Sequence, residues 1–174
     1  MSAVSAEPGA GRHLRGLARF NAAPPTAATT LLFGCCGSHR WAERVSAHRP
    51  YPTVDSLLAA ADEAGYDLSG PELDAALAHE TATPAPPDAP PAARTALDAG
   101  LAAYQGRFGH AFVISLDTVA PAERLDRILA AIRSRLGNEK EEERVVAADE
   151  LRRLARARIK CSIYAGPVRP ECGE

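Results

Sequence analysis

The chain has 174 residues, a formal net charge of −2 and a hydrophobic content of 46%, which are ordinary values for one globular domain. The near-neutral charge argues against nucleic acid or an anionic membrane as a partner, and no apolar run reaches the roughly 18 residues that a transmembrane span requires. Aromatic residues make up only 5%, so the core must consist mainly of aliphatic side chains, which favours helices over strands.

The composition predicts one compact, all-α, multi-helix domain over residues 12–165, with a loose segment at each end. Residues 1–11 are rich in Ala, Gly, Pro and Ser and lack the apolar stretch of a signal peptide, so we expect a disordered tail there. Residues 166–174 are expected to form a loose C-terminal tail. A cytoplasmic location follows by default.

Short helices are expected along the first half of the chain, each bounded by proline, glycine or a capping side chain. Helices are expected over residues 12–20, 26–36 and about 69–80, and two more are expected to begin after Ser38 and after Thr53. Thr53 precedes apolar residues in the i, i+3, i+4, i+7 series, and Ser69 with Glu72 has the spacing of a capping box. These patterns predict amphipathic helices around an aliphatic core.

A proline-rich bridge over residues 83–91 interrupts the helices, because its five prolines forbid a continuous helix and favour extended structure. A helix over 92–107 is expected next. Residues 108–114 are the only stretch that resembles a strand, but a lone strand has no partner, so we expect a buried extended connection. Pro121 then begins an amphipathic helix, and the last helix runs from about 139 to 162.

The four cysteines do not have the spacing of a zinc site or of a disulfide framework, since Cys35 and Cys36 are adjacent. Buried or incidental thiols in a reducing compartment are the simplest interpretation. A bridge between Cys161 and Cys172, or a nucleophilic Cys35 or Cys36, are the alternatives.

Arg158 stands out because it shares the apolar face of the last helix with Leu151, Leu154 and Ala155. A charge on a core-facing stripe needs a partner, so Arg158 is either part of a structural ion pair, a snorkelling side chain, or an arginine that binds a carboxylate. The other arginines of that helix project elsewhere and are expected to be solvated: Arg152, Arg153 and Arg156.

His79 ends its helix just before the bridge. The helix dipole alone favours a histidine at this place, and a role in proton transfer near neutral pH is the functional alternative. Residues 141–143 are three glutamates that have the pattern of an acidic first turn and not of a metal site. The chain contains no phosphate-binding glycine loop and no zinc signature.

Three groups of residues together point to a known family. Tyr104, Phe108, Phe112 and Ile114 have the spacing of a Tyr-x-x-x-Phe-Gly-x-x-Phe-Val-Ile stretch. An Arg-Leu-Gly-Asn element at 135–138 is followed by Glu143 and by the arginine-rich stretch 150–159, and Cys-Gly-Ser and Arg-Pro elements occur upstream at 36–38 and 49–50. In order and spacing, residues 20–159 resemble the family of 2-oxo-4-hydroxy-4-carboxy-5-ureidoimidazoline (OHCU) decarboxylases.

This resemblance implies an all-helical fold and decarboxylation to (S)-allantoin in urate degradation, with no organic cofactor and no metal. It also implies site residues: His79 matches the catalytic histidine, Arg158 matches the substrate-binding arginine, and Phe112 and Ile114 match positions that line the pocket with backbone groups available for the ring. The expected partner is a small-molecule ureidoimidazoline, and a homodimer is among the possible assemblies.

The sequence departs from the family at two places. Glu80 stands where the family has a proline after the histidine, and the family's Ser-x-x-Glu-Gln element, whose glutamate joins in proton transfer, has no counterpart between His79 and Tyr104. Asp88 and Asp98 are the only acids in the bridge and in residues 92–100. The expectation is therefore a decarboxylase of reduced activity, and the alternatives are an inactive relative that binds a ligand or a protein, or a pocket for an unrelated small carboxylate.

Overall fold

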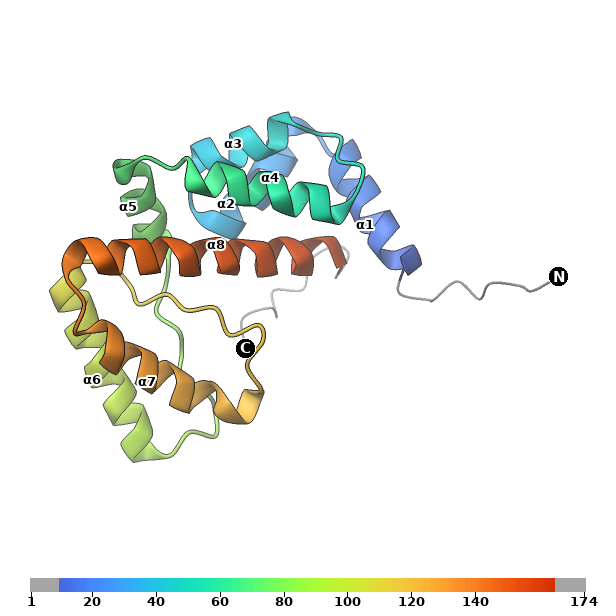
Figure 1. Ribbon diagram of the computed structural model, residues 1–174. Helices are drawn as coiled ribbons and strands as arrows, with labels where there is room; N and C mark the ends of the chain where they lie inside the picture. Colours follow the sequence, from blue (N-terminus) through green and yellow to red (C-terminus); the bar gives the residue numbers. More distant parts are fainter. Residues whose placement is uncertain (1–9, 165–174) are drawn as a thin grey trace. The chain divides into compact units, whose positions relative to one another are not determined.

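The computed structural model describes residues 10–164, with side chains from Arg15 onward. This part of the chain is built of helices, with two longer connections over residues 80–90 and 109–120 (Figure 1). The elements are α1 (Ala10–Ala22), α2 (Pro25–Cys36), α3 (His39–Ala47), α4 (Val54–Tyr66), α5 (Gly70–His79), α6 (Pro91–Phe108), the 3₁₀ turn η1 (Pro121–Glu123), α7 (Arg124–Arg135) and α8 (Lys140–Tyr164). No strand occurs in residues 10–164, so the predicted all-α, multi-helix class is confirmed.

The helix boundaries agree with the sequence patterns to within a few residues. Of the predicted N-terminal tail, residues 1–9 lie outside the described residues, and residues 10 and 11 begin α1. The predicted tail over 166–174 and Cys172 also lie outside them. Within the described range, no helix combines the length and the apolarity needed to cross a membrane.

The chain divides into two compact units. The first unit comprises residues up to Asp67 together with those from Ala155 onward, and the second unit comprises Leu68–Leu154. Helices α1–α4 belong to the first unit, and α5, α6, η1 and α7 belong to the second. The 25-residue helix α8 begins in the second unit and ends in the first.

In the first unit, the expected capping residues begin the helices. Ser38 precedes α3 and its Oγ accepts from the N–H of Trp41 at 3.3 Å. Thr53 precedes α4 and its Oγ1 accepts from the N–H of Ser56 at 3.1 Å. The Trp41 indole is buried and donates to the carbonyl of Ala61 at 2.9 Å, which joins α3 to α4. Local capping signals and one buried aromatic residue therefore set the path of these helices.

In the second unit, α6 packs against α7 around an aliphatic and aromatic cluster. The buried members of this second-unit core are Leu97, Tyr104, Phe112, Ile114, Ile128 and Ile132. The amphipathic helix predicted after Pro121 is confirmed, because Ile128 and Ile132 are buried and the leucines at 125, 129 and 136 pack partly buried against the same cluster. The expected extended connection is also confirmed, since residues 111–116 form neither helix nor strand and include three buried residues.

The proline-rich bridge has a defined path between α5 and α6. It is non-helical from Glu80 to Pro90, and Pro91 is the first residue of α6, where a missing N–H does no harm. Arg94 of α6 donates to the carbonyls of Pro87 and Ala89, and Ala85 packs against the second-unit core. The bridge is thus attached to the second unit by both polar and apolar contacts.

Gly16 allows α1 to approach the end of α8 within the first unit. A Cβ atom at Gly16 would lie 1.8 Å from the carbonyl oxygen of Ile163, far inside contact distance, whereas a Cβ at Gly34 of α2 would meet nothing within 4 Å. We therefore expect Gly16→Ala to lower the free energy of unfolding by about 1–3 kcal/mol. Gly34→Ala, the matched control, should raise it by up to about 1 kcal/mol because alanine favours helix.

Urea unfolding of both variants checks this expectation. Equal midpoints for Gly16→Ala and Gly34→Ala would show that α1 does not pack closely against α8.

Candidate functional site

His79, the residue matched to the family's catalytic histidine, is the last residue of α5 and is exposed. The capping pair predicted at the other end of α5 is present, since both the N–H and the hydroxyl of Ser69 donate to Glu72. Arg144 of α8 fixes the start of α5 by an ion pair with Asp74 at 2.7 Å and a hydrogen bond to the Gly70 carbonyl at 2.6 Å. The helix that carries His79 is therefore anchored at its first turns.

Phe112 and Ile114 lie in the connection between α6 and η1, which we call the extended segment (residues 111–116). Both side chains belong to the second-unit core, and Leu116 packs against it, whereas Val113 does not belong to the cluster. This period of two is the mark of an extended backbone, in which alternate side chains point to the same face. The side chains of Phe112 and Ile114 therefore serve the core, and what they can offer a ligand is their main-chain groups.

The main-chain groups of the extended segment divide between two edges. In an extended chain, consecutive residues direct their N–H and C=O groups to opposite edges. On one edge, the Val113 carbonyl accepts from Arg135 Nη1 at 2.7 Å and the Ser115 N–H donates to Glu150 Oε2 at 2.8 Å. No hydrogen bond within residues 10–164 uses the N–H or C=O of Phe112 or Ile114. We call these four groups the backbone edge; they form two donor–acceptor pairs that a ligand could bind.

A buried polar network lies behind the extended segment. Glu143 is fully buried, and Arg135, whose side chain is 8% exposed, binds its Oε1 through Nε at 2.8 Å and Nη2 at 2.6 Å. Tyr104 donates its hydroxyl to the same oxygen, and Asn138 Nδ2 donates to Oε2 at 2.9 Å. Burial, and then the hydrogen bond to Glu143, raise the pKa of Tyr104 above its usual value, so this hydroxyl stays protonated.

Sequence reasoning missed this network. Residues 141–143 form the acidic first turn of α8 as expected, but only Glu141 and Glu142 are exposed, and the burial of Glu143 was not expected. A signal was nevertheless available, because Tyr104, Arg135, Asn138 and Glu143 all stand at positions of the quoted family patterns. The hydrogen bonds that the other three side chains make to the Glu143 carboxylate explain why these residue types occur together at that spacing.

Arg158 belongs to the first unit and is half-buried, between the buried residues Ala155 and Ile159 of α8. Its Nη1 donates to the carbonyl of Cys35 at 3.1 Å. Of the three arginines expected to be solvated, Arg153 is exposed and Arg156 keeps 37% of its side chain exposed in a pair with Asp62. For Arg152 the expectation is wrong, because its side chain is only 15% exposed and pairs with Asp149. A helical projection alone does not reveal such ion pairs, because it does not show where the carboxylates of other turns and helices lie.

The cysteines beside Arg158 have the character of structural thiols. Cys35 and Cys36 are buried, and burial raises the pKa of the Cys35 thiol to about 11. Only a thiolate is a good nucleophile, so this environment disfavours the nucleophilic alternative for Cys35. The Cys35 thiol instead donates to the carbonyl of Leu31 at 3.4 Å.

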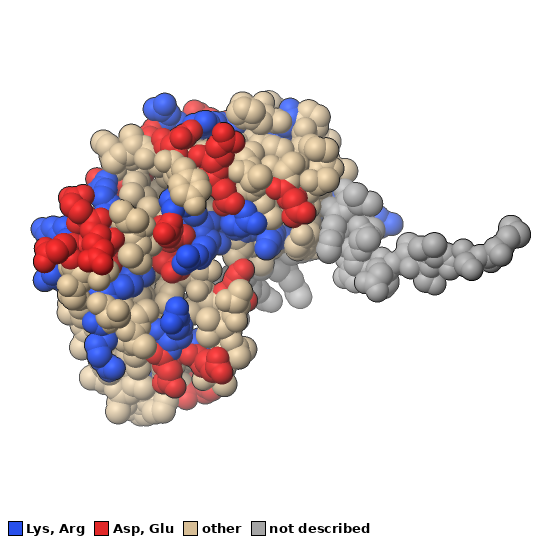
Figure 2. Space-filling model, in the orientation of Figure 1, with Lys and Arg blue, Asp and Glu red and all other residues tan. Residues whose placement is uncertain are grey.

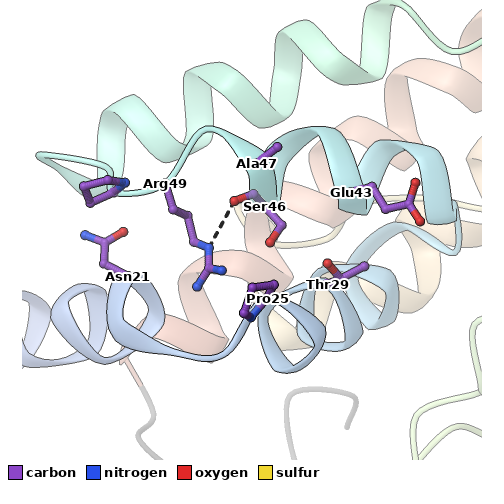
Figure 3. Close-up of a pocket in the computed structure, with 8 residues that line it drawn as sticks. Asn21, Pro25, Thr29, Glu43, Ser46, Ala47 and Arg49 are labelled. Carbon is purple, nitrogen blue, oxygen red and sulfur yellow. Dashed lines mark hydrogen bonds between the residues drawn. The ribbon is translucent and has the colours of Figure 1, made fainter.

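A pocket of about 470 Å³ opens in the first unit, and none of the residues matched to the family's site lines it (Figure 3). Its lining comprises Asn21, Pro25, Thr29, Glu43, Ser46, Ala47, Arg49 and Pro50. Arg49 donates to the carbonyls of Phe20 at 2.7 Å, Ala23 at 2.8 Å and Ser46 at 3.1 Å. The Arg-Pro element therefore has a structural explanation, because Arg49 satisfies carbonyls at the ends of α1 and α3.

Charges on the surface occur in mixed groups. Figure 2 shows basic and acidic side chains next to one another on the face in view, and Arg44 with Asp67, at 2.6 Å, is one exposed pair. Among the described residues, no group of three or more His, Cys, Asp or Glu side chains could hold a metal ion.

The buried ion pair gives a stability prediction. Glu143→Gln removes one charge and leaves Arg135 buried without its counter-charge, which should lower the free energy of unfolding by about 3–5 kcal/mol. Glu142→Gln, at the exposed neighbouring position, is the matched control and should change it by less than about 0.5 kcal/mol. Urea unfolding monitored by circular dichroism measures both, and equal stabilities would show that Glu143 is not buried as described.

Comparison with solved structures supports the same fold. The chain is similar to the crystal structure of an (S)-allantoin synthase, with a TM-score of 0.68 and 18% identity over 84% of this chain and 53% of that one. It is also similar to an OHCU decarboxylase crystallised in the presence of (S)-allantoin, with a TM-score of 0.66 and 19% identity over 76% of this chain and 96% of that one. The chain thus spans about half the length of the synthase. No curated protein matches it.

A family model described as OHCU decarboxylase matches residues 21–82 and 71–160. The two matched segments overlap around His79, so the alignment breaks beside the proline-rich bridge, where the sequence departs from the family. Together they cover well over half of the chain, including the extended segment, the buried network and Arg158. The chain therefore belongs to the OHCU decarboxylase family.

Proposed function

We propose that this protein decarboxylates OHCU to (S)-allantoin in the cytoplasmic degradation of urate, without a cofactor and more slowly than relatives that carry the Ser-x-x-Glu-Gln element. Family membership supports the reaction class. The observation that carries the proposal is the backbone edge, whose donors and acceptors on Phe112 and Ile114 have no partner within the described part of the chain. Buried main-chain groups are almost always paired, so such an edge calls for a ligand.

The chemistry of the substrate complements this edge. A ureido group and a ring amide each present an N–H beside a C=O, and an N–H beside a C=O is what each residue of the backbone edge offers in return. The ring would therefore bind much as a neighbouring strand binds in a sheet. Such a contact orients the ring without adding a charge to it.

Decarboxylation needs little more than orientation and control of one proton. The carboxylate leaves as carbon dioxide, and its bonding electrons stay on the ring as an enolate-like species. One proton added from a single face then gives a single enantiomer. We assign Arg158 to the substrate carboxylate, for which its planar fork is suited, and His79 to proton transfer.

The missing family glutamate determines the expected rate. No Glu-Gln pair occurs in residues 80–100, and the two acids that follow Glu80 in that range, Asp88 and Asp98, are exposed. Loss of one acid–base group typically lowers a rate by about 10²–10⁴-fold, so a slow enzyme is expected. The same absence favours the alternative function of an inactive relative that binds a urate-breakdown ligand.

Freshly generated OHCU provides the test. Spontaneous decay gives racemic allantoin, so we expect the protein to produce an excess of the (S)-enantiomer, followed by circular dichroism or chiral chromatography. Equal amounts of both enantiomers, as in the protein-free control, would exclude the enzyme. If (S)-allantoin then still raised the melting temperature, the ligand-binding alternative would be favoured.

Variants test the assignment of residues. His79→Ala and Arg158→Ala should each lower the yield of (S)-allantoin by at least about tenfold, because each removes a group that handles the proton or the carboxylate. His48→Ala and Arg133→Ala, at exposed positions of the same residue types, serve as controls and should keep parental activity. Parental activity in His79→Ala or in Arg158→Ala would show that the assigned residue is not part of the site.

A further inference from the structure

We propose that Arg135, held in place by Glu143, is a positioning residue that sets the backbone edge for the substrate, with Glu150 as its second anchor. The inference rests on the proposed function, since it concerns how the ligand-binding edge is fixed. It assigns a role to residues that do not touch the ligand themselves.

The first step is the immobility of the Arg135 guanidinium. Three of its nitrogens make hydrogen bonds: Nε and Nη2 to Glu143, Nη2 also to the Tyr104 hydroxyl at 3.1 Å, and Nη1 to Val113. Its Cζ lies 4.5 Å from the centre of the Phe112 ring and 5.5 Å from that of Tyr104. Because the Arg135 guanidinium is planar, its hydrogen bonds and its two aromatic neighbours together fix its orientation.

The second step is what this orientation does to the extended segment. Arg135 reaches the Val113 carbonyl at 2.7 Å, and Glu150 accepts from the Ser115 N–H at 2.8 Å. The two anchored groups lie on one edge, on either side of Ile114. Since consecutive residues face opposite edges, fixing Val113 and Ser115 fixes the direction of the N–H and C=O groups of Phe112 and Ile114.

The third step separates positioning from stability. A lysine at position 135 keeps the positive charge beside Glu143, but its single ammonium group cannot reproduce the planar fork that joins the carboxylate to the Val113 carbonyl. Glu150 offers an independent approach, because it lies outside the buried network of Glu143 and its ion-pair partner, Arg153, is exposed, so its loss should leave the fold intact. Glu150→Gln retains an oxygen that can accept from Ser115, whereas Glu150→Ala does not.

The experiment compares Arg135→Lys, Glu150→Ala and Glu150→Gln with the parental full-length chain. We expect Arg135→Lys and Glu150→Ala to raise KM for OHCU, and Kd for (S)-allantoin, by about tenfold, with kcat changed less than about threefold. Glu150→Gln should restore parental values. Arg44→Lys, in the exposed pair with Asp67, is the control for an arginine-to-lysine change in an ion pair.

Hydrogen exchange provides a readout that does not need activity. The peptide covering residues 109–117 should exchange faster in Arg135→Lys and in Glu150→Ala than in the parental chain, Glu150→Gln or Arg44→Lys. Unchanged exchange in both variants would overturn the proposal, whether or not the chain is an enzyme. Faster exchange with parental KM and Kd would also overturn it, because the anchored segment would then not bind the ligand.

The two proposals fail in different ways. If the parental chain neither turned over OHCU nor bound (S)-allantoin, the proposed function and the role of Arg135 toward a ligand would both be overturned. If the parental chain were active and both variants matched it in KM, Kd and exchange, only the role of Arg135 and Glu150 would be overturned.

Discussion

Glu143 is a carboxylate that is fully buried in the second unit, and a buried carboxylate needs a counter-charge and hydrogen-bond donors for both of its oxygens. Its partners Tyr104, Arg135 and Asn138 come from α6, from the end of α7 and from the turn that follows it, so one carboxylate fixes three parts of the chain to the start of α8. The same guanidinium that neutralises Glu143 also holds Val113. The path of the extended segment, and with it the groups available to a ligand, therefore depends on an ion pair that no ligand needs to touch.

The helices could be predicted from sequence because the signals that start and stop them are local. Ser38 and Thr53 cap the helices that they were expected to cap, and the prolines of residues 83–91 end one helix and begin another. The burial of Glu143 could not be predicted in this way. Three consecutive glutamates look equivalent in sequence, and which of them faces inward depends on the position of Arg135, which is a tertiary property. The low exposure of Arg152 also escaped prediction, since a helical projection does not show that its side chain pairs with Asp149.

The candidate site was predictable only in part. Resemblance to the family pointed to His79, Arg158, Phe112 and Ile114, and membership of the family is established; the roles of these residues remain proposals. Phe112 and Ile114 show why residue identity is a limited guide, because their side chains fill the core while their main-chain groups have no hydrogen-bond partner within the described residues. Whether a main-chain group is available depends on which neighbours have already bound to it, and this cannot be read from the residue type.

The backbone edge also bears on how such a protein can change over evolutionary time. Every residue except proline carries the same N–H and C=O, so a site made of these groups persists through substitutions that would destroy one made of side chains. Selection would then act on the volume of the core that packs against the extended segment and on its two anchors, Arg135 and Glu150, and not on a recognisable catalytic motif. The similarity of this chain to the synthase, with a TM-score of 0.68 at only 18% identity, shows how far a sequence can change while the fold is kept.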